Sequence, residues 1–239
     1  MGKMRFTSAF KFIIVFLTYQ TLGDENMALF DNVNLMELLL SGSQVQSNKN
    51  LADKAGLDMA DFGRIAAVGL PAILSAINKN NQSDRGLESF DQALNKHEDV
   101  KQYDSLDQLT QNVDPQDGDK ILGHVFADKQ TNIIDRIADT LGLTPEAVKR
   151  ALIVIAPLVL KYLADRKDTK QLDRDGIQKE TKNSVEEINS SLRNYQKKAP
   201  SNEGGSILDS IFGQNQAQSP NTQQNSNGGL LDNILDLLK

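Results

Sequence analysis

The same 28-residue apolar pattern occurs twice in this chain of 239 residues, at 51–78 and again, 86 residues later, at 137–164. Aligned without a gap, the two segments are identical at eight positions, and their apolar positions agree more widely. The identities are Ala52/Ala138, Asp53/Asp139, Gly56/Gly142, Leu57/Leu143, Arg64/Arg150, Val68/Val154, Pro71/Pro157 and Leu74/Leu160. Apolar residues at i, i+3 and i+4 are typical of core-facing helices. The repeat therefore predicts an all-α fold built around a duplicated unit.

Each copy contains the signals for a helix, a tight turn and a second helix. Gly56 and Gly142 end the first helix, because glycine accepts the left-handed conformation common at helix C-termini. Asp58 and Thr144 follow as N-caps, since their side-chain oxygens can accept hydrogen bonds from the free amides of the next turn. Pro145 takes the first helical position, where its missing N–H costs nothing. Both copies are therefore predicted to be helix-turn-helix units.

The second helix of each copy is apolar on all sides and carries a proline. Residues 65–70 and 151–156 are uniformly apolar, which is typical of helices buried at the centre of a bundle. Pro71 and Pro157 lie well inside these helices, where a proline removes an intrahelical hydrogen bond and clashes with the preceding turn. We therefore predict that each proline kinks its helix or starts a new one. The two helices are expected to pack together about a pseudo-two-fold axis.

Shorter amphipathic segments precede, separate and follow the two copies. Helical spacing predicts helices at 33–40, 44–55, 86–96, 105–112 and 118–127. After the second copy, an apolar stripe over 175–196 predicts a peripheral helix within residues 167–198. The duplicated helical domain itself is expected to occupy residues 28–166.

Residues 1–26 resemble a secretory signal, because basic residues precede a short apolar run at 12–19. That run is too short to span a bilayer, which takes about 20 apolar residues, and no A-x-A cleavage site follows it. The alternative is that Met27 is the natural start and the upstream residues are an extension. A start at Met27 predicts a cytoplasmic protein, whereas a working signal would export it.

The last 41 residues, 199–239, have a different composition from the rest of the chain. Gln, Asn, Ser, Gly and Pro make up 22 of the 31 residues from 199 to 229. Such a composition cannot bury enough apolar surface to offset chain entropy, so it predicts a disordered tail. Two apolar patches interrupt it, Ile207, Leu208, Ile211 and Phe212, then Leu230, Leu231, Ile234 and Leu235. Short amphipathic patches suit docking into a groove, either on a partner or on the protein's own domain.

Composition and charge exclude several classes of function. The chain has no cysteine, which excludes disulfides, thiolate metal sites and thiol catalysis. A net charge of −6 argues against the whole chain binding nucleic acid or anionic membranes. The tail has no Lys or Arg between residues 198 and 239, so attraction of its patches to anionic lipid is not expected.

Three features together resemble a known bacterial family. They are the G-L-[DT] turn, the apolar helix with its proline, and the segment Asp117–Phe126 between the copies. Together they resemble the bacterial domain of unknown function 937 family, whose members include the YidB-like proteins. The resemblance runs from Met27 to residue 166, with weaker likeness in the Gly-plus-aliphatic motifs of the tail. It implies an all-helical bacterial domain without an established activity.

The helix-turn-helix spacing makes nucleic-acid binding an alternative function. In a DNA reader, the start of the second helix enters the major groove and presents side chains to base edges. In the second copy that segment presents Thr144, Lys149 and Arg150, which are the candidate contacts. The first copy is acidic at the same place, and neither copy offers Asn or Gln to read adenine. The favoured interpretation is a structural role for both turns.

Nothing in the pattern indicates catalysis or a cofactor. Residues 114–119 look like a calcium loop, but placing Gly118 at the sixth position puts Val113 and His124 where oxygen ligands are needed. His97 and His124 are the only histidines, too few for a metal site or an acid–base pair. His124 lies in an apolar run, which predicts a partly buried packing residue. We therefore expect no catalytic, metal or cofactor site and no small-molecule substrate.

The sequence favours a non-catalytic module for protein–protein interaction or self-association. In this interpretation the helical domain is the scaffold, and the tail is a tether or docking strip carrying the two apolar patches. Nucleic-acid binding through the second copy remains the alternative, and a stable membrane span is not expected.

Overall fold

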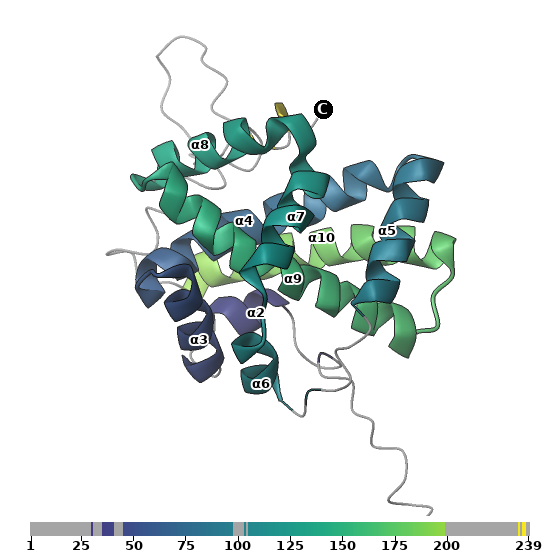
Figure 1. The fold of residues 1–239 in the computed structure, drawn as a ribbon, viewed down its shortest axis with the longest axis horizontal. Helices are drawn as coiled ribbons and strands as arrows, with labels where there is room; N and C mark the ends of the chain where they lie inside the picture. Colours follow the sequence, from purple (N-terminus) through teal and green to yellow (C-terminus); the bar gives the residue numbers. More distant parts are fainter. Residues whose placement is uncertain are drawn as a thin grey trace, which may run out of the picture.

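The computed structural model describes residues 30, 35–40, 45–97, 103, 105–198, 234 and 236–237 (Figure 1). All regular secondary structure within these ranges is helical, with no strand, so the predicted all-α class is confirmed. The segment 1–26 and most of the tail, including Ile207, Leu208, Ile211, Phe212, Leu230, Leu231 and Leu235, lie outside the described residues.

The helices follow one another with short connections. Before and through the first copy they are α2 (Leu35–Leu40), α3 (Val45–Ala55) and α4 (Met59–Asn80). Between the copies lie α5 (Asp84–Lys96), α6 (Leu106–Gln111), α7 (Pro115–Phe126) and the 3-10 turn η3 (Ala127–Lys129). The second copy and its extension are α8 (Gln130–Leu141), α9 (Pro145–Thr169) and α10 (Arg174–Lys198). The shorter helices expected from spacing are thus present, each with bounds shifted by a few residues.

The turn signals of the two copies act as predicted. Gly56 and Gly142 have φ of +64° and +65°, the left-handed conformation that ends α3 and α8. The Asp58 carboxylate caps α4 by accepting from the amide of Asp61 at 2.8 Å. Thr144 caps α9 in the same way. Both helix-turn-helix units are therefore closed by local interactions.

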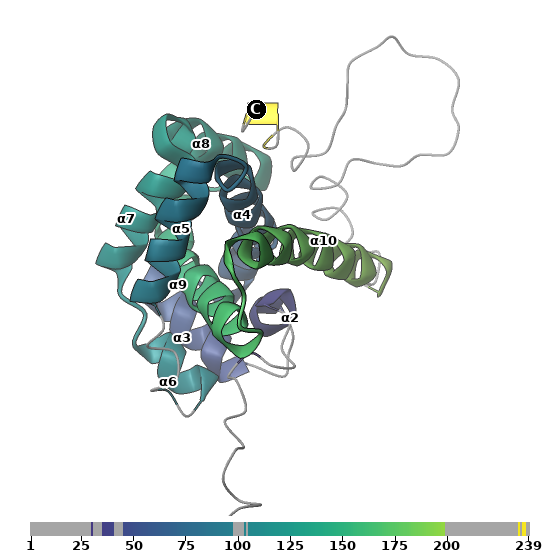
Figure 2. The same ribbon diagram turned by 90° about the vertical axis from the view of Figure 1, so that its right-hand side faces the viewer.

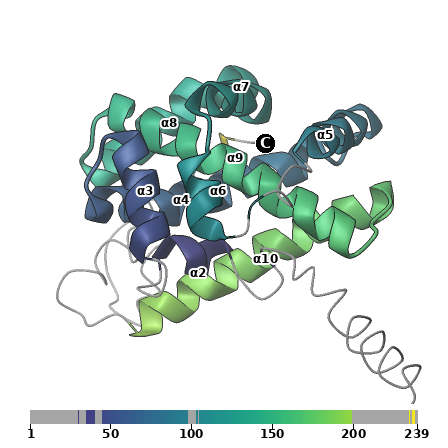
Figure 3. The same ribbon diagram turned by 60° about the horizontal axis from the view of Figure 1, so that its bottom comes forward.

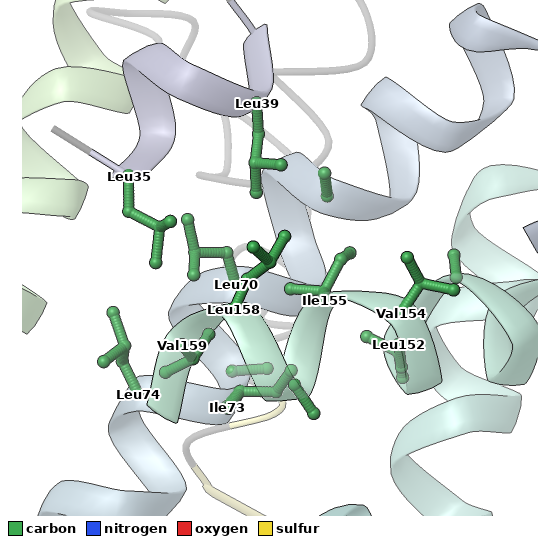
Figure 4. Packing of buried hydrophobic residues seen from close by; sticks show 14 of the residues in the cluster. Leu35, Leu39, Leu70, Ile73, Leu74, Leu152, Val154, Ile155, Leu158 and Val159 are labelled. Atoms are coloured by element: carbon green, nitrogen blue, oxygen red, sulfur yellow. The ribbon is translucent and has the colours of Figure 1, made fainter. Parts of the chain in front are cut away.

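The apolar helices α4 and α9 cross at the centre of the fold, as predicted (Figure 1). Gly69 permits the close approach, because a Cβ placed there would lie 2.3 Å from Cδ2 of Leu152. Figure 4 shows aliphatic side chains from both helices meeting beside α2. The labelled residues are Leu35, Leu39, Leu70, Ile73, Leu74, Leu152, Val154, Ile155, Leu158 and Val159. Burying this aliphatic surface is the main source of stability, at about 25 cal/mol per Å² of apolar area.

Both prolines lie inside continuous helices, so neither Pro71 nor Pro157 starts a new one. Pro157 cannot donate to the carbonyl of Ile153, its i−4 residue. Gly118 of α7 approaches this carbonyl so closely that a Cβ on Gly118 would lie 1.8 Å from the oxygen. A Cα–H group can make a weak hydrogen bond to a carbonyl at such a contact. The α7–α9 packing therefore covers the backbone group that the proline leaves without its usual donor.

The helix expected to be peripheral, α10, contributes to the core. Ile177, Ile188 and Leu192 are each no more than 3% exposed and belong to the same apolar cluster as α4 and α9. Figure 3 shows α10 lying alongside α2, and the two helices are in contact. The bundle therefore extends through residues 174–192 instead of ending at 166.

Candidate functional site

The two repeats hold each other through equivalent arginines. Arg150 Nε donates to the backbone carbonyl of Ala55 at 2.8 Å. Arg64 Nη2 donates to the carbonyl of Leu141. Arg64 and Arg150 are 86 residues apart, as are Ala55 and Leu141, so each copy gives the other the same bond. This reciprocity supports the predicted pseudo-two-fold relation between the copies.

Both acceptors are the final residues of the helices before the turns, α3 and α8. The last carbonyls of a helix have no intrahelical donor and carry partial negative charge, so a guanidinium group is a favourable partner. Arg64 also forms an ion pair with Asp61 at 3.0 Å. The arginines thus join the repeats at the point where a DNA-binding helix-turn-helix would present its reading surface.

The three residues singled out for nucleic-acid contact all make contacts within the protein. Thr144 is the N-cap of α9 and accepts from the amide of Ala147 at 3.2 Å. Lys149 Nζ lies 2.9 Å from a carboxylate oxygen of Asp119, and its side chain is 45% exposed. Arg150 Nε donates a hydrogen bond to the carbonyl of Ala55 in the first copy. The sequence did not predict that Arg64 and Arg150 bond across the repeats. The signal that could have indicated it is the identity of this arginine in both copies.

Individual apolar residues before α2 and after α10 pack on the helical domain. Phe30 is 1% exposed, and its ring meets the ring of Tyr162 edge to face with centroids 5.5 Å apart. Ile234 is 0% exposed within the apolar cluster, and Leu237 packs against that cluster. Figure 2 shows the yellow segment that contains them beside α8. Of the eight candidate docking residues, Ile234 is the one that lies within the described part of the chain, and it is docked on the chain's own domain.

A charged cluster joins α9 to α10. The Glu180 carboxylate lies 3.1 Å from Arg166 and 2.8 Å from Lys170, and its side chain is 9% exposed. The Arg166 guanidinium lies over the ring of Tyr162, 4.9 Å from its centroid. Burial raises the pKa of Tyr162 to about 12, because the low-dielectric interior disfavours the phenolate. The opposite charges are paired with one another, which is the arrangement of a structural ion-pair network.

The histidines lie in different environments. His97 Nε2 is 3.6 Å from a carboxylate oxygen of Asp117. His124 is exposed, so the prediction that it packs in a partly buried position was wrong. The buried stripe of α7 runs through Ile121, Leu122 and Phe126, which turns His124 toward solvent. Within the described residues, no group of three His, Asp or Glu side chains is placed to hold a metal ion.

One helix of the described part of the chain, α4, is long and apolar enough to cross a membrane. However, 78% of its most apolar stretch is buried inside the protein. A core helix satisfies the same length and composition criterion, and α4 has that position here.

Comparison with known proteins identifies a family. The family model described as "Bacterial protein of unknown function (DUF937)" matches residues 37–166 and 168–239. The match includes both repeats and also residues 168–239, where the sequence showed a weaker likeness in the tail motifs. No curated protein and no solved structure matches the chain.

Proposed function

This chain belongs to the DUF937 family, and we propose that it is a non-catalytic helical module for protein–protein interaction or assembly, with the tail as its docking strip. The observation that carries the proposal is the burial of Phe30 and Ile234 in the helical domain. Phe30 and Ile234, from short segments of the same form 204 positions apart, are both buried in the helical core. A domain that buries an apolar residue from each of two such segments is suited to bind amphipathic segments.

The polar groups of the domain also favour an interaction role. Arg166, Lys170 and Glu180 pair with one another, and Arg64 and Arg150 bind helix C-termini. A catalytic site needs acid, base or nucleophile side chains converging on one reacting atom. These side chains are instead used to connect helices.

Affinity capture from the native cell tests the proposal. The bait is the full chain, compared with a chain that ends at Lys198 and therefore lacks the tail. Proteins or further copies of this chain retained by both baits would contact the helical domain, and those retained by the full chain alone would contact the tail. Recovery of no specific protein by either bait would contradict an interaction module.

Nucleic-acid binding through the start of α9 is the second proposal. It is supported by Lys149, which is 45% exposed next to the capped N-terminus of α9. It is weakened by Asp119, because that carboxylate lies against the lysine and would repel phosphate. A mobility-shift titration at low salt should show binding that Lys149→Ala reduces. Absence of any shift with the native chain would eliminate this alternative.

A further inference from the structure

Three short segments of this chain share one pattern: two apolar residues, Asp, a small polar residue and a further apolar residue. They are residues 29–33, 207–211 and 230–234. In the first and the last, the structure places an apolar side chain in the core, Phe30 and Ile234 respectively. Ile234 belongs to the apolar cluster of the domain, so the domain buries an aliphatic residue of the C-terminal copy of the pattern.

The covalent chain does not confine the C-terminal segment to its own domain. Helix α10 ends at Lys198, and 35 residues, 199–233, connect it to Ile234. A stretch of that length can span at most about 120 Å, which is several times the diameter of a small domain. Ile234 can thus reach the equivalent site on a neighbouring copy.

We propose that the C-terminal segment, residues 230–237, is exchanged between copies, so that Ile234 of one chain occupies the site on a second chain. The proposal rests on the proposed assembly function and names its partner, a second copy of this chain. Exchange of an identical element costs little because every contact at the site is the same within one chain and between two. The balance between the two forms is set by protein concentration against the effective concentration of the tethered segment.

The chemistry of the segment favours a second copy over an acidic or basic surface. Its apolar residues are interrupted only by Asp232, Asn233 and Asp236, and it contains no Lys or Arg. Recognition therefore depends on burying aliphatic side chains such as Ile234, which is fully buried. A neighbouring copy has the same apolar cluster, so it can bury Ile234 in the same way.

The first experiment measures binding of a labelled peptide with the sequence of residues 228–239 to full-length protein. In the native chain the tethered segment competes for the site. In the Ile234→Asp chain the buried aspartate disfavours docking, so the peptide should bind this variant roughly tenfold or more tightly than the native chain. A peptide carrying the same Ile234→Asp change should not bind. Asn225→Asp is the matched control, since it adds the same charge to the tail without altering the docking segment.

The second experiment measures sedimentation of the full-length chains over a range of concentrations. The native chain and the Asn225→Asp control should associate as concentration rises, and Ile234→Asp should associate less. Leu237→Asp, at a partly buried contact of the same segment, provides a second variant if Ile234→Asp does not fold by circular dichroism.

Exchange is overturned if the peptide binds neither Ile234→Asp nor Leu237→Asp, or if these two variants associate as strongly as the native chain. In that second case association itself would persist, and the proposed assembly function would stand without this mechanism. Failure of the assembly function is a different result, namely no association of the native chain and no protein captured by it.

Discussion

Arg150 Nε lies 2.8 Å from the carbonyl oxygen of Ala55, so the second repeat caps the C-terminal end of a helix in the first. The equivalent arginine, Arg64, makes the equivalent bond to Leu141. Two bonds related by the 86-residue repeat show that duplication preserved the contact between the copies. The two arginine contacts between the repeats should therefore contribute to the stability of the fold.

Loss of the Arg64 side chain should destabilise the fold. Its side chain is 30% exposed and bridges Asp61 and the Leu141 carbonyl, and hydrogen bonds of charged groups contribute about 1.5–3 kcal/mol. Arg64→Ala should therefore lower the free energy of unfolding by about 2 kcal/mol in urea. Arg150 is more exposed, so Arg150→Ala should cost about 1 kcal/mol.

Lys49→Ala is the matched control for the arginine variants. It removes an ion pair with Asp53 whose side chains are 54% and 61% exposed, and such surface pairs contribute about 0–1 kcal/mol. If Arg64→Ala unfolded at the same urea concentration as Lys49→Ala, the contact between the repeats would not contribute to stability as described.

Replacing each of two glycines of α7 by alanine should change the stability of the fold in opposite directions. A Cβ at Gly118 would lie 1.8 Å from the Ile153 carbonyl oxygen, whereas a Cβ at Gly123 meets nothing within 4 Å. Gly118→Ala must push α7 away from α9, at a cost of about 1–3 kcal/mol. Gly123→Ala should stabilise the helix by about 0.5–1 kcal/mol, because alanine has the higher helix propensity. Thermal unfolding of the two variants measures the contrast, and equal shifts would contradict the close approach.

Neutralising Glu180 should loosen α10. Glu180→Gln keeps the size of the side chain but removes the charge that pairs with Arg166 and Lys170. We expect a loss of about 1–3 kcal/mol, because the charge-assisted hydrogen bonds of Glu180 to Arg166 and Lys170 are weakened. Arg166 keeps its ion pair with Glu187 at 3.4 Å, which limits the loss. Glu88→Gln is the control, because Glu88 and Arg174 are 52% and 56% exposed. Amide hydrogen exchange in α10 should rise for Glu180→Gln and not for Glu88→Gln. Unchanged protection in Glu180→Gln would show that the charged cluster does not hold α10 against α9.

Stability should fall at high pH because of Tyr162. Its pKa is raised by burial from the ordinary 10.0 to about 12, so the unfolded chain ionises first. The contribution is fully present below pH 10 and is lost as the pH rises through about 10 to 12, a change of about 2–3 kcal/mol. Denaturant unfolding at about pH 9 and about pH 11.5 should show a steeper decline for the native chain than for Tyr162→Phe. Parallel declines would show that the phenol ionises normally in the folded state.

Sequence signals predicted helix ends correctly where the interactions that form them are between neighbouring residues. Gly56, Gly142, Asp58 and Thr144 act within one or two turns of themselves, and each has its predicted role. His124 was misplaced because an apolar run does not by itself reveal which side of α7 faces the core. The stripe through Ile121, Leu122 and Phe126 decided that.

The candidate site was less predictable than the fold, since its residues act over long separations. Arg150 was expected among nucleic-acid contacts, yet its partner, Ala55, lies 95 positions away. Ile234 was expected to dock on a partner or on its own domain, and the structure places it in the apolar core of its own chain.

The sequence by itself determined the helices, the caps at Asp58 and Thr144 and the burial of the two proline-bearing segments, because each follows from residues within a few turns of one another. It also revealed the duplicated unit, since the same pattern recurs 86 residues later. The tertiary structure alone decided that Arg64 and Arg150 bind across the repeats, that Gly118 covers the Ile153 carbonyl, and that α10 completes the core. Those contacts depend on how helices approach in space, and hydrophobic periodicity reports only that a face is buried, not what it is buried against.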